Sequence, residues 1–223
     1  MSILIVPGYQ GSGKAHWQTW LQQEFPDSRR LVGVDWQRPV LYRWARAIGD
    51  ELRAAREPVV VVAHSFGCLA AALAVKALPG KVAAAVLVAP ADPQRFSVWG
   101  KRTHWRALTR GLDPHLPTDW LGVPGVLVGS QNDPWMAQAD AQALAERWGL
   151  AFQDAGRAGH INADSGYGPW PWIANLLRDR GLCVSSVYSA RRRPALVQTE
   201  AQILAQAQIP ISVQAQAALR FYS

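Results

Sequence analysis

Ser65 stands where a hydrophobic strand is expected to meet a helix. It follows the run Pro58-Val59-Val60-Val61-Val62-Ala63 and precedes an alanine-rich stretch, with Ala63 and Gly67 two positions away on either side. This small-x-Ser-x-Gly pattern is typical of a nucleophile elbow, in which a strained turn lifts the serine oxygen out of the sheet. Alanine replaces the commoner first glycine and still meets the steric need. An ordinary Ser-x-Gly turn would not need these neighbours, so we predict that Ser65 is a nucleophile.

A general base for such a serine is expected late in the chain, after an acid. His160 lies in the glycine-rich segment Gly159-His160-Ile161-Asn162, which follows the last predicted strand. There it would take the serine proton and return it to the leaving group. His64, next to the nucleophile, is expected to point away and to be structural. The remaining histidines do not follow a strand at the right point of this order: His16, His104 and His115.

The acid that orients the base is expected on the loop after the preceding strand. Asp133 fits, because it ends the run Val126-Leu127-Val128-Gly129-Ser130-Gln131-Asn132. It would fix the imidazole tautomer and stabilise the imidazolium. Asp-Pro before a helix is also an ordinary capping pattern, and one residue can serve both purposes. Asp154 and Asp164 are weaker alternatives, since one ends a strand and the other follows His160.

Two backbone N–H groups are needed to bind the oxyanion of an acyl-transfer intermediate. One is expected from Phe66, the residue after the nucleophile. The other is expected from the loop after the first strand, where glycines allow a close approach of the backbone. Within that loop, Pro7-Gly8-Tyr9-Gln10-Gly11-Ser12-Gly13, we predict the amide of Tyr9, with Gln10 as second choice.

The same loop also fits a rival chemistry. Residues Gly8–Lys14 match G-x-x-x-x-G-K between a predicted strand and a helix, and such loops bind phosphates. The match fails at Ala15, which has no hydroxyl for Mg²⁺. Only Asp35 could serve as an acid at the end of a second strand. This hypothesis leaves the elbow, the acid loop and the late histidine unexplained, so nucleotide binding is kept as a minority alternative.

The elements that must position these residues alternate along the chain. Strands are expected at Ser2–Val6, Leu31–Val34, Pro58–Ala63, Val82–Val88, Val123–Val128 and Leu150–Asp154. Helices are expected at Lys14–Glu24, Leu41–Arg56, Phe66–Leu78, Met136–Trp148 and Trp170–Arg180. Uniformly apolar strands between amphipathic helices indicate a parallel sheet covered on both faces. We therefore predict a three-layer α/β/α sandwich with a mostly parallel sheet of about six strands.

Two segments break this alternation. Residues 90–122 are rich in proline and tryptophan without a clear period, and an insertion there is expected to roof the ligand site. Trp99, Trp105 and Trp135 are candidate pocket residues, although a core position is equally consistent with each. Residues 182–223 are basic and then rich in alanine and glutamine. We predict a hydrolase domain over residues 1–181 and an extension over 182–223, for which the sequence names no protein partner.

Composition narrows the class of protein. The 223 residues are 49% hydrophobic and 17% charged, which suits one domain with a large core. The net charge is +7, but its arginines are scattered, so no nucleic-acid interface is expected. No apolar run is long enough to span a membrane. Cys68 lies at an expected buried helix start, so a disulfide with Cys183 is not expected and the cytoplasm is the default compartment. No metal-ligand pair such as His-x-x-x-His or Cys-x-x-Cys occurs, and the proposed chemistry needs no cofactor.

These segments, taken in order, resemble a known family. The chain is similar to the small serine hydrolases of the retinoblastoma-binding protein 9 and YdeN type. The similarity lies in the segments Pro7-Gly8-Tyr9-Gln10-Gly11-Ser12 with His16-Trp17, His64-Ser65-Phe66-Gly67, Gly129–Pro134, and Gly159-His160-Ile161-Asn162 through Trp170. The resemblance spans residues 1 to about 180. It implies an α/β-hydrolase fold, a triad at Ser65, Asp133 and His160, and an esterase or aminopeptidase-like activity. The retinoblastoma-pocket motif Leu-x-Cys-x-Glu is absent, so that partner is not implied.

The sequence therefore favours a serine hydrolase that cleaves a small-molecule ester or amide through an acyl-enzyme. A non-catalytic α/β module that binds a partner through its tryptophan-rich insertion or basic tail is the alternative from another class.

Overall fold

A parallel sheet forms the centre of the molecule in the computed structural model, which describes residues 2–102 and 111–178. Its six strands lie in the order β2-β1-β3-β4-β7-β8, and every neighbouring pair is parallel. A separate two-stranded antiparallel hairpin consists of β5 and β6. The strands are β1 Ile3–Val6, β2 Arg29–Arg30, β3 Val59–His64, β4 Val82–Val88, β5 Phe96–Ser97, β6 Gly100–Lys101, β7 Gly125–Gly129 and β8 Ala151–Asp154.

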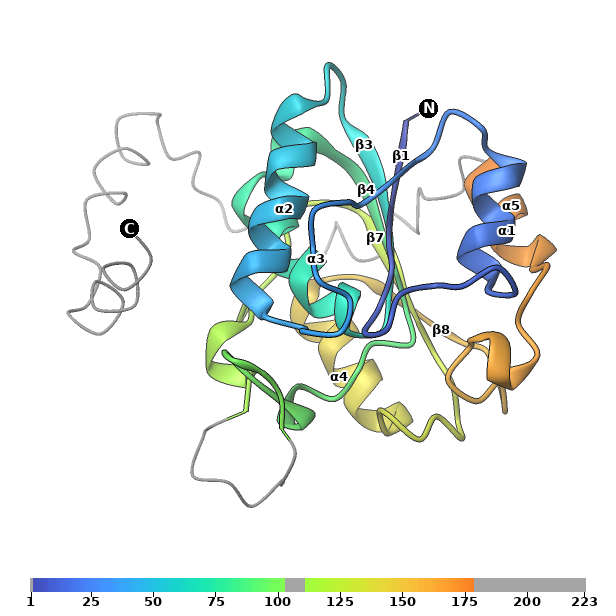
Figure 1. Cartoon of the computed structure of the whole chain (residues 1–223). Coiled ribbons are helices and arrows are strands. Elements are labelled where there is room, and N and C mark those ends of the chain that lie inside the picture. Colours follow the sequence, from blue (N-terminus) through green and yellow to red (C-terminus); the bar gives the residue numbers. More distant parts are fainter. Residues whose placement is uncertain (1, 103–110, 179–223) are drawn as a thin grey trace. The chain divides into compact units, whose positions relative to one another are not determined.

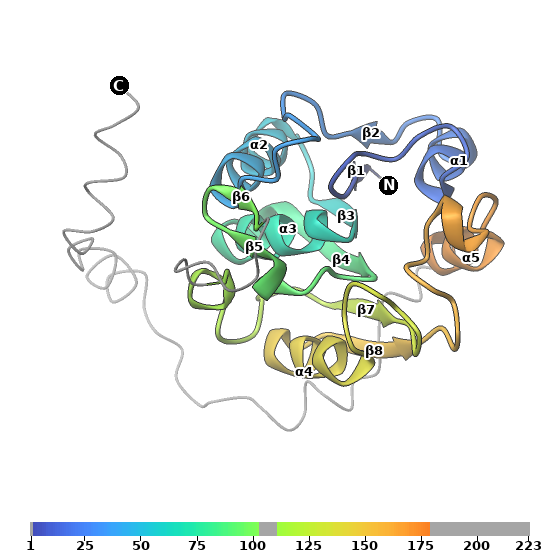
Figure 2. The ribbon, with the colours of Figure 1, turned by 60° about the horizontal axis from the view of Figure 1, so that its bottom comes forward.

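Helices cover both faces of the sheet. They are α1 Trp17–Glu24, α2 Leu41–Ala54, α3 Phe66–Ala77, α4 Gln138–Trp148 and α5 Pro171–Arg178, with short 3₁₀ turns at Pro79–Lys81, Pro93–Arg95, Asp113–His115 and Ala163–Ser165. Helices α1 and α5 lie on one face, and α2, α3 and α4 on the other (Figures 1 and 2). Successive strand residues point to opposite faces: Leu4 and Val6 pack with the α2–α3–α4 side, Ile3 and Ile5 with the α1–α5 side. This two-sided burial explains why the strands are apolar without alternation.

This topology gathers the loops that matter for chemistry. Parallel strands all end at the same edge of a sheet, so the segments that follow β1, β3, β7 and β8 meet there. Those segments carry Tyr9, Ser65, Asp133 and His160 respectively. Strand β3 lies between β1 and β4 and is buried at every residue, which places Ser65 near the middle of this edge.

The predicted three-layer fold with about six mostly parallel strands is confirmed, and two element boundaries are corrected. The second strand is Arg29–Arg30 rather than Leu31–Val34. Only Arg29 and Arg30 pair with β1, and the chain then turns at Gly33, where φ is +76°. The first helix begins at Trp17 rather than Lys14, because the side chain of His16 caps it by accepting a hydrogen bond from the Gln18 amide.

The irregular insertion is partly defined. Residues 93–102 form a 3₁₀ turn and the β5–β6 hairpin, while His104 and Trp105 lie outside the described residues. The predicted extension 182–223, with Cys183, also lies outside them, so the boundary at residue 181 stays a prediction. Within the described residues, no helix is both long enough and apolar enough to cross a membrane.

Candidate active site

Ser65 forms the strained turn that the elbow motif predicts. Its φ is 55° and its ψ is −127°, a backbone conformation that non-glycine residues rarely adopt. The surroundings require small neighbours, because a Cβ atom on Gly67 would overlap the carbonyl oxygen of Pro7. The turn is anchored by the Ser65 amide, which donates to the Val88 carbonyl at 3.1 Å. The hydroxyl is thereby fixed at the N-terminus of α3.

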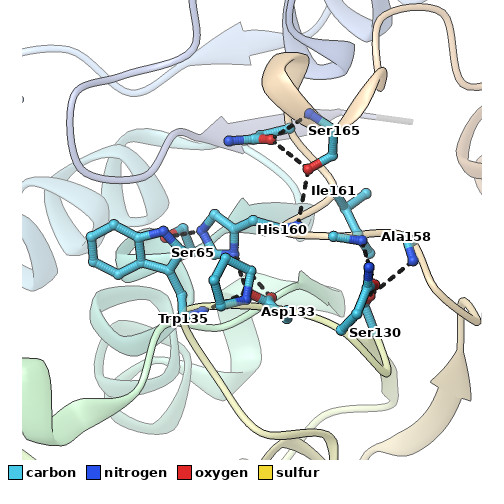
Figure 3. A network of polar contacts seen from close by, with 12 residues as sticks. Ser65, Ser130, Asp133, Trp135, Ala158, His160, Ile161 and Ser165 are labelled. Atoms are coloured by element: carbon cyan, nitrogen blue, oxygen red, sulfur yellow. Dashed lines mark hydrogen bonds and ion pairs between the residues drawn. The ribbon is translucent and has the colours of Figure 1, made fainter.

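A continuous set of hydrogen bonds joins Ser65 to His160 and Asp133 (Figure 3). His160 Nε2 lies 2.9 Å from Ser65 Oγ, and Nδ1 lies 2.9 Å from each Asp133 carboxylate oxygen. A carboxylate can only accept, so Nδ1 carries the proton in this arrangement and Nε2 is free to accept from the serine hydroxyl. The structure thus brings together the three residues that the sequence indicated. Their side chains are buried, which limits competition from water.

The acid and base loops are also tied to each other. Asn132 Oδ1 accepts from the Gly159 amide at 2.8 Å, and Ser130 Oγ accepts from the Ala158 amide at 3.0 Å. On the other side of the imidazole, the His160 amide donates to Ser165 Oγ at 3.1 Å (Figure 3). These bonds hold the backbone on both sides of His160. The aspartate and the imidazole are therefore positioned by the loops themselves and not only by their mutual hydrogen bond.

The loop after β1 passes directly beside the nucleophile. A Cβ atom on Gly8 would lie 2.7 Å from Ser65 Cβ and 3.3 Å from its Oγ. The Gln10 amide is engaged, because it donates to the Trp36 carbonyl at 2.8 Å, so the second choice for the oxyanion hole is disfavoured. Within the described residues, the Tyr9 and Phe66 amides have no backbone acceptor. Their assignment to the oxyanion hole stays a prediction.

A group of buried histidines behind the base was not predicted as part of the site. His64 Nε2 donates to the backbone carbonyl of His160 at 2.9 Å, and the His64 ring lies 4.9 Å from the rings of both His16 and His160. Burial lowers the pKa of His64 well below its usual value, assisted by the nearby His160 and His16. Burial, followed by Arg30 and His160, lowers the pKa of His16 to about 4. Both imidazoles are therefore neutral at neutral pH.

A side chain at the start of α1 forms a hydrogen bond with Ile161, the residue that follows the base. Trp17 Nε1 donates to the Ile161 carbonyl at 2.8 Å, and the Trp17 side chain is fully buried. Ile161 has a φ of 47°, an unusual value for a β-branched residue. The backbone carbonyls of residues 160 and 161 thus each accept a hydrogen bond, the first from His64 and the second from Trp17. The His16-Trp17 pair in the sequence was the available signal for this support.

The alternative acids and the buried thiol of Cys68 lie elsewhere. Asp154 is exposed and accepts from the Gln131 side chain at 2.9 Å and from the Gly156 amide at 2.7 Å, and these bonds, Gln131 first, lower its pKa. Asp164 is exposed in the 3₁₀ turn Ala163–Ser165. The buried thiol of Cys68 donates to the Val88 carbonyl, and burial raises its pKa. None of these groups bonds to Ser65 or His160.

The loop Gly8–Lys14 does not have phosphate-loop geometry. In a phosphate loop the glycine-lysine pair opens the helix, so that helix amides face the anion. Here the helix begins three residues after Lys14, whose side chain is exposed. The Ser12 carbonyl accepts from the Arg30 guanidinium, and the Gly13 carbonyl from the Thr19 hydroxyl. Among residues 2–102 and 111–178, no group of His, Cys, Asp and Glu side chains could hold a metal ion.

Comparisons with known proteins agree with this architecture. A family model described as serine hydrolase matches residues 3–179. A YdeN-like hydrolase from Pectobacterium atrosepticum is 35% identical, with a TM-score of 0.70 and coverage of 81% of this chain and 91% of that one. The ydeN gene product from B. subtilis is 19% identical, with a TM-score of 0.61 and coverages of 80% and 97%. Alpha/beta hydrolase domain-containing protein 10 from mouse is 16% identical, with a TM-score of 0.59 and coverages of 82% and 90%. A comparison with curated protein sequences gives no match.

Proposed function

The chain belongs to the serine hydrolase family, and from that premise we propose that it cleaves a small ester or amide through an acyl-enzyme on Ser65. The observation that carries the proposal is the relay of 2.9 Å contacts from Asp133 through His160 to Ser65. This relay matches the geometry required of a base that is oriented by an acid and bonded to a nucleophile. A module that only binds a partner would have no use for it.

In the first half of the reaction, Ser65 Oγ attacks the substrate carbonyl carbon while His160 Nε2 takes the hydroxyl proton. The carbonyl oxygen becomes an oxyanion that the Phe66 and Tyr9 amides stabilise. Asp133 stabilises the imidazolium through Nδ1. Collapse of the tetrahedral intermediate expels the alcohol or amine, which receives the proton from Nε2, and leaves the acyl group on Ser65.

In the second half, water attacks the acyl-enzyme and His160 again acts as base. The second tetrahedral intermediate expels Ser65 Oγ, which recovers its proton from the imidazolium, and the carboxylic acid is released. Every step uses groups of this chain and water. Deletion of the base or the nucleophile is expected to lower turnover by several orders of magnitude, because the relay acts as a unit.

The direct test is labelling with a fluorophosphonate probe, followed by intact-mass measurement. Wild type is expected to gain one adduct, and Ser65→Ala none. Ser28→Ala is a matched control, because Ser28 is also buried and its hydroxyl has no hydrogen-bond partner among the described residues. It is expected to label like wild type. An adduct on folded Ser65→Ala, or no adduct on folded wild type, contradicts an activated serine at this position.

A further inference from the structure

A cavity of about 540 Å³ opens beside the oxyanion loop, and all its charged lining residues are basic. It is bordered by Tyr9, by the segment 37–39 that follows β2, and by the β5–β6 hairpin, residues 99–102. The charged members are Arg38, Lys101 and Arg102. We call this space the basic cavity. Among the residues that the structure describes, no aspartate or glutamate lines it.

Lys101 connects the basic cavity to the proposed catalytic residues. Its ammonium lies 5.1 Å from the centroid of the Tyr9 ring and 5.3 Å from that of the Trp135 ring. The Trp135 ring in turn stacks on the His160 imidazole, at 5.7 Å and 30°. Tyr9 directly follows Gly8, which touches Ser65. The ammonium therefore lies near two aromatic side chains, one next in sequence to Gly8 and the other stacked on the base.

Two of these cations, Lys101 and Arg38, form no ion pair within the described part of the chain. No carboxylate there is within ion-pair distance of Lys101 or Arg38. The guanidinium of Arg95 adds a further cation, 5.0 Å from the Trp135 ring. Of the nearby acids, Asp35 accepts from the Gln37 amide and Asp92 from the Gln94 amide, which are local turn contacts. An incoming anion would thus compete with few carboxylates of the described residues for binding to Lys101 and Arg38.

This charge distribution bears on the choice of substrate. An aminopeptidase-type substrate carries an α-ammonium group close to its scissile carbonyl and needs an anion to bind it. The carboxylate of Asp133 is already engaged by His160, and the charged residues that line the basic cavity are positive. A positively charged substrate would be repelled by these cations, whereas a carboxylate would be attracted to the exposed ammonium of Lys101.

We propose that the substrate is an ester bearing an anionic group, which Lys101 binds in the basic cavity while the ester carbonyl lies at Ser65. This inference rests on the proposed function. The anion belongs either to the acyl part or to the leaving alcohol, and the experiment distinguishes the two. Recognition by a charged hydrogen bond predicts a preference for the anionic ester of about tenfold or more over a neutral ester of equal size.

The experiment compares kcat/KM for matched ester pairs. p-Nitrophenyl hemiglutarate and its methyl ester place the charge in the acyl part. 4-Acetoxybenzoate and its methyl ester place it in the leaving group. We expect wild type to prefer the anionic member of at least one pair, and the preferred pair identifies which part of the substrate enters the cavity. Added salt should reduce the preference, because it screens the charge of an exposed lysine.

Lys101→Met is expected to reduce the anionic-to-neutral ratio about tenfold, since it removes the charge and keeps an apolar chain of similar length. Lys101→Arg should keep most of the ratio. Lys14→Met, which removes another exposed lysine, is the matched control and should keep all of it. A wild-type ratio of one or less for both pairs, or the same ratio in Lys101→Met as in wild type, overturns the inference. Hydrolysis of the neutral esters by wild type separates the two failures: if it persists, the serine hydrolase proposal stands and only the anion preference is wrong.

Discussion

Acidification is expected to destabilise this fold through His16 in particular. The pKa of His16 is about 4 in the folded chain, against 6.5 for a free histidine, mainly because the ring is buried and next because Arg30 and His160 are close. The unfolded chain therefore binds a proton at a higher pH than the folded chain does. The contribution of His16 to the free energy of unfolding is fully present above pH 6.5, its pKa in the unfolded chain. This contribution is lost as pH falls from 6.5 toward 4.

The size of the effect follows from the two pKa values. At pH 7.5 both states are deprotonated and His16 contributes almost no pH dependence. At pH 4.5 the unfolded state is fully protonated and the folded state mostly is not, so linkage predicts a loss of about 2.5 kcal/mol relative to pH 7.5. At pH 5.5 the predicted loss is about 1.4 kcal/mol. These are large fractions of the stability of an ordinary domain.

Urea unfolding of wild type and His16→Asn at these three pH values isolates the His16 part. Asparagine keeps the helix cap, because its side-chain oxygen can accept from the Gln18 amide as His16 Nδ1 does, but it does not titrate. The variant is expected to lose about 2.5 kcal/mol less than wild type between pH 7.5 and 4.5. Parallel losses in the two proteins would refute the assigned cause, whatever the total acid sensitivity. His16→Ala removes the cap as well, and should add a pH-independent penalty of about 1 kcal/mol.

Two further substitutions probe the support of the site. His64→Leu removes the donor to the His160 carbonyl and is expected to lower the free energy of unfolding in urea by about 1–3 kcal/mol. Because the backbone of the base loses this hydrogen bond, kcat on a neutral ester should fall by a larger factor than KM rises. Wild-type stability and wild-type kcat would contradict the positioning role. Gly67→Ala would press a methyl group onto the Pro7 carbonyl and is expected to destabilise the fold by about 1–3 kcal/mol. Gly80→Ala, with open space at its Cβ, is the control and should be close to neutral. Equal stabilities of the two variants would show that the backbone turn at Ser65 can relax.

The sequence was sufficient to predict most of the framework, because the signals for it are local. The apolar run at β3 followed by Ala63-His64-Ser65-Phe66-Gly67 carries both the strand and the elbow in consecutive residues. Chain order then limited the acid and base to the loops after β7 and β8. The second strand was misplaced for the opposite reason: Arg29 and Arg30 have no strand-like character, and only their pairing with Leu4 and Ile5 makes them a strand.

The supports of the site could not be predicted, because they depend on contacts between distant parts of the chain. His64 reaches the carbonyl of a residue 96 positions away, and Trp17 one that is 144 positions away. Lys101 lies in an irregular segment whose path no periodicity indicates. Its position between Tyr9 and Trp135 becomes visible only when the hairpin is folded against the sheet edge.

The neutral histidines behind the base also have a consequence for the chemistry. In the proposed mechanism His160 becomes an imidazolium during attack, and a second positive charge 4.9 Å away on His64 would oppose that step. Burial keeps His64 uncharged, and its hydrogen bond to the His160 carbonyl requires a proton on Nε2, which the neutral ring supplies. The same burial makes the fold sensitive to acid, as His16 illustrates. The acid sensitivity predicted for the fold and the absence of a second positive charge beside His160 therefore have one physical origin, the burial of His16 and His64.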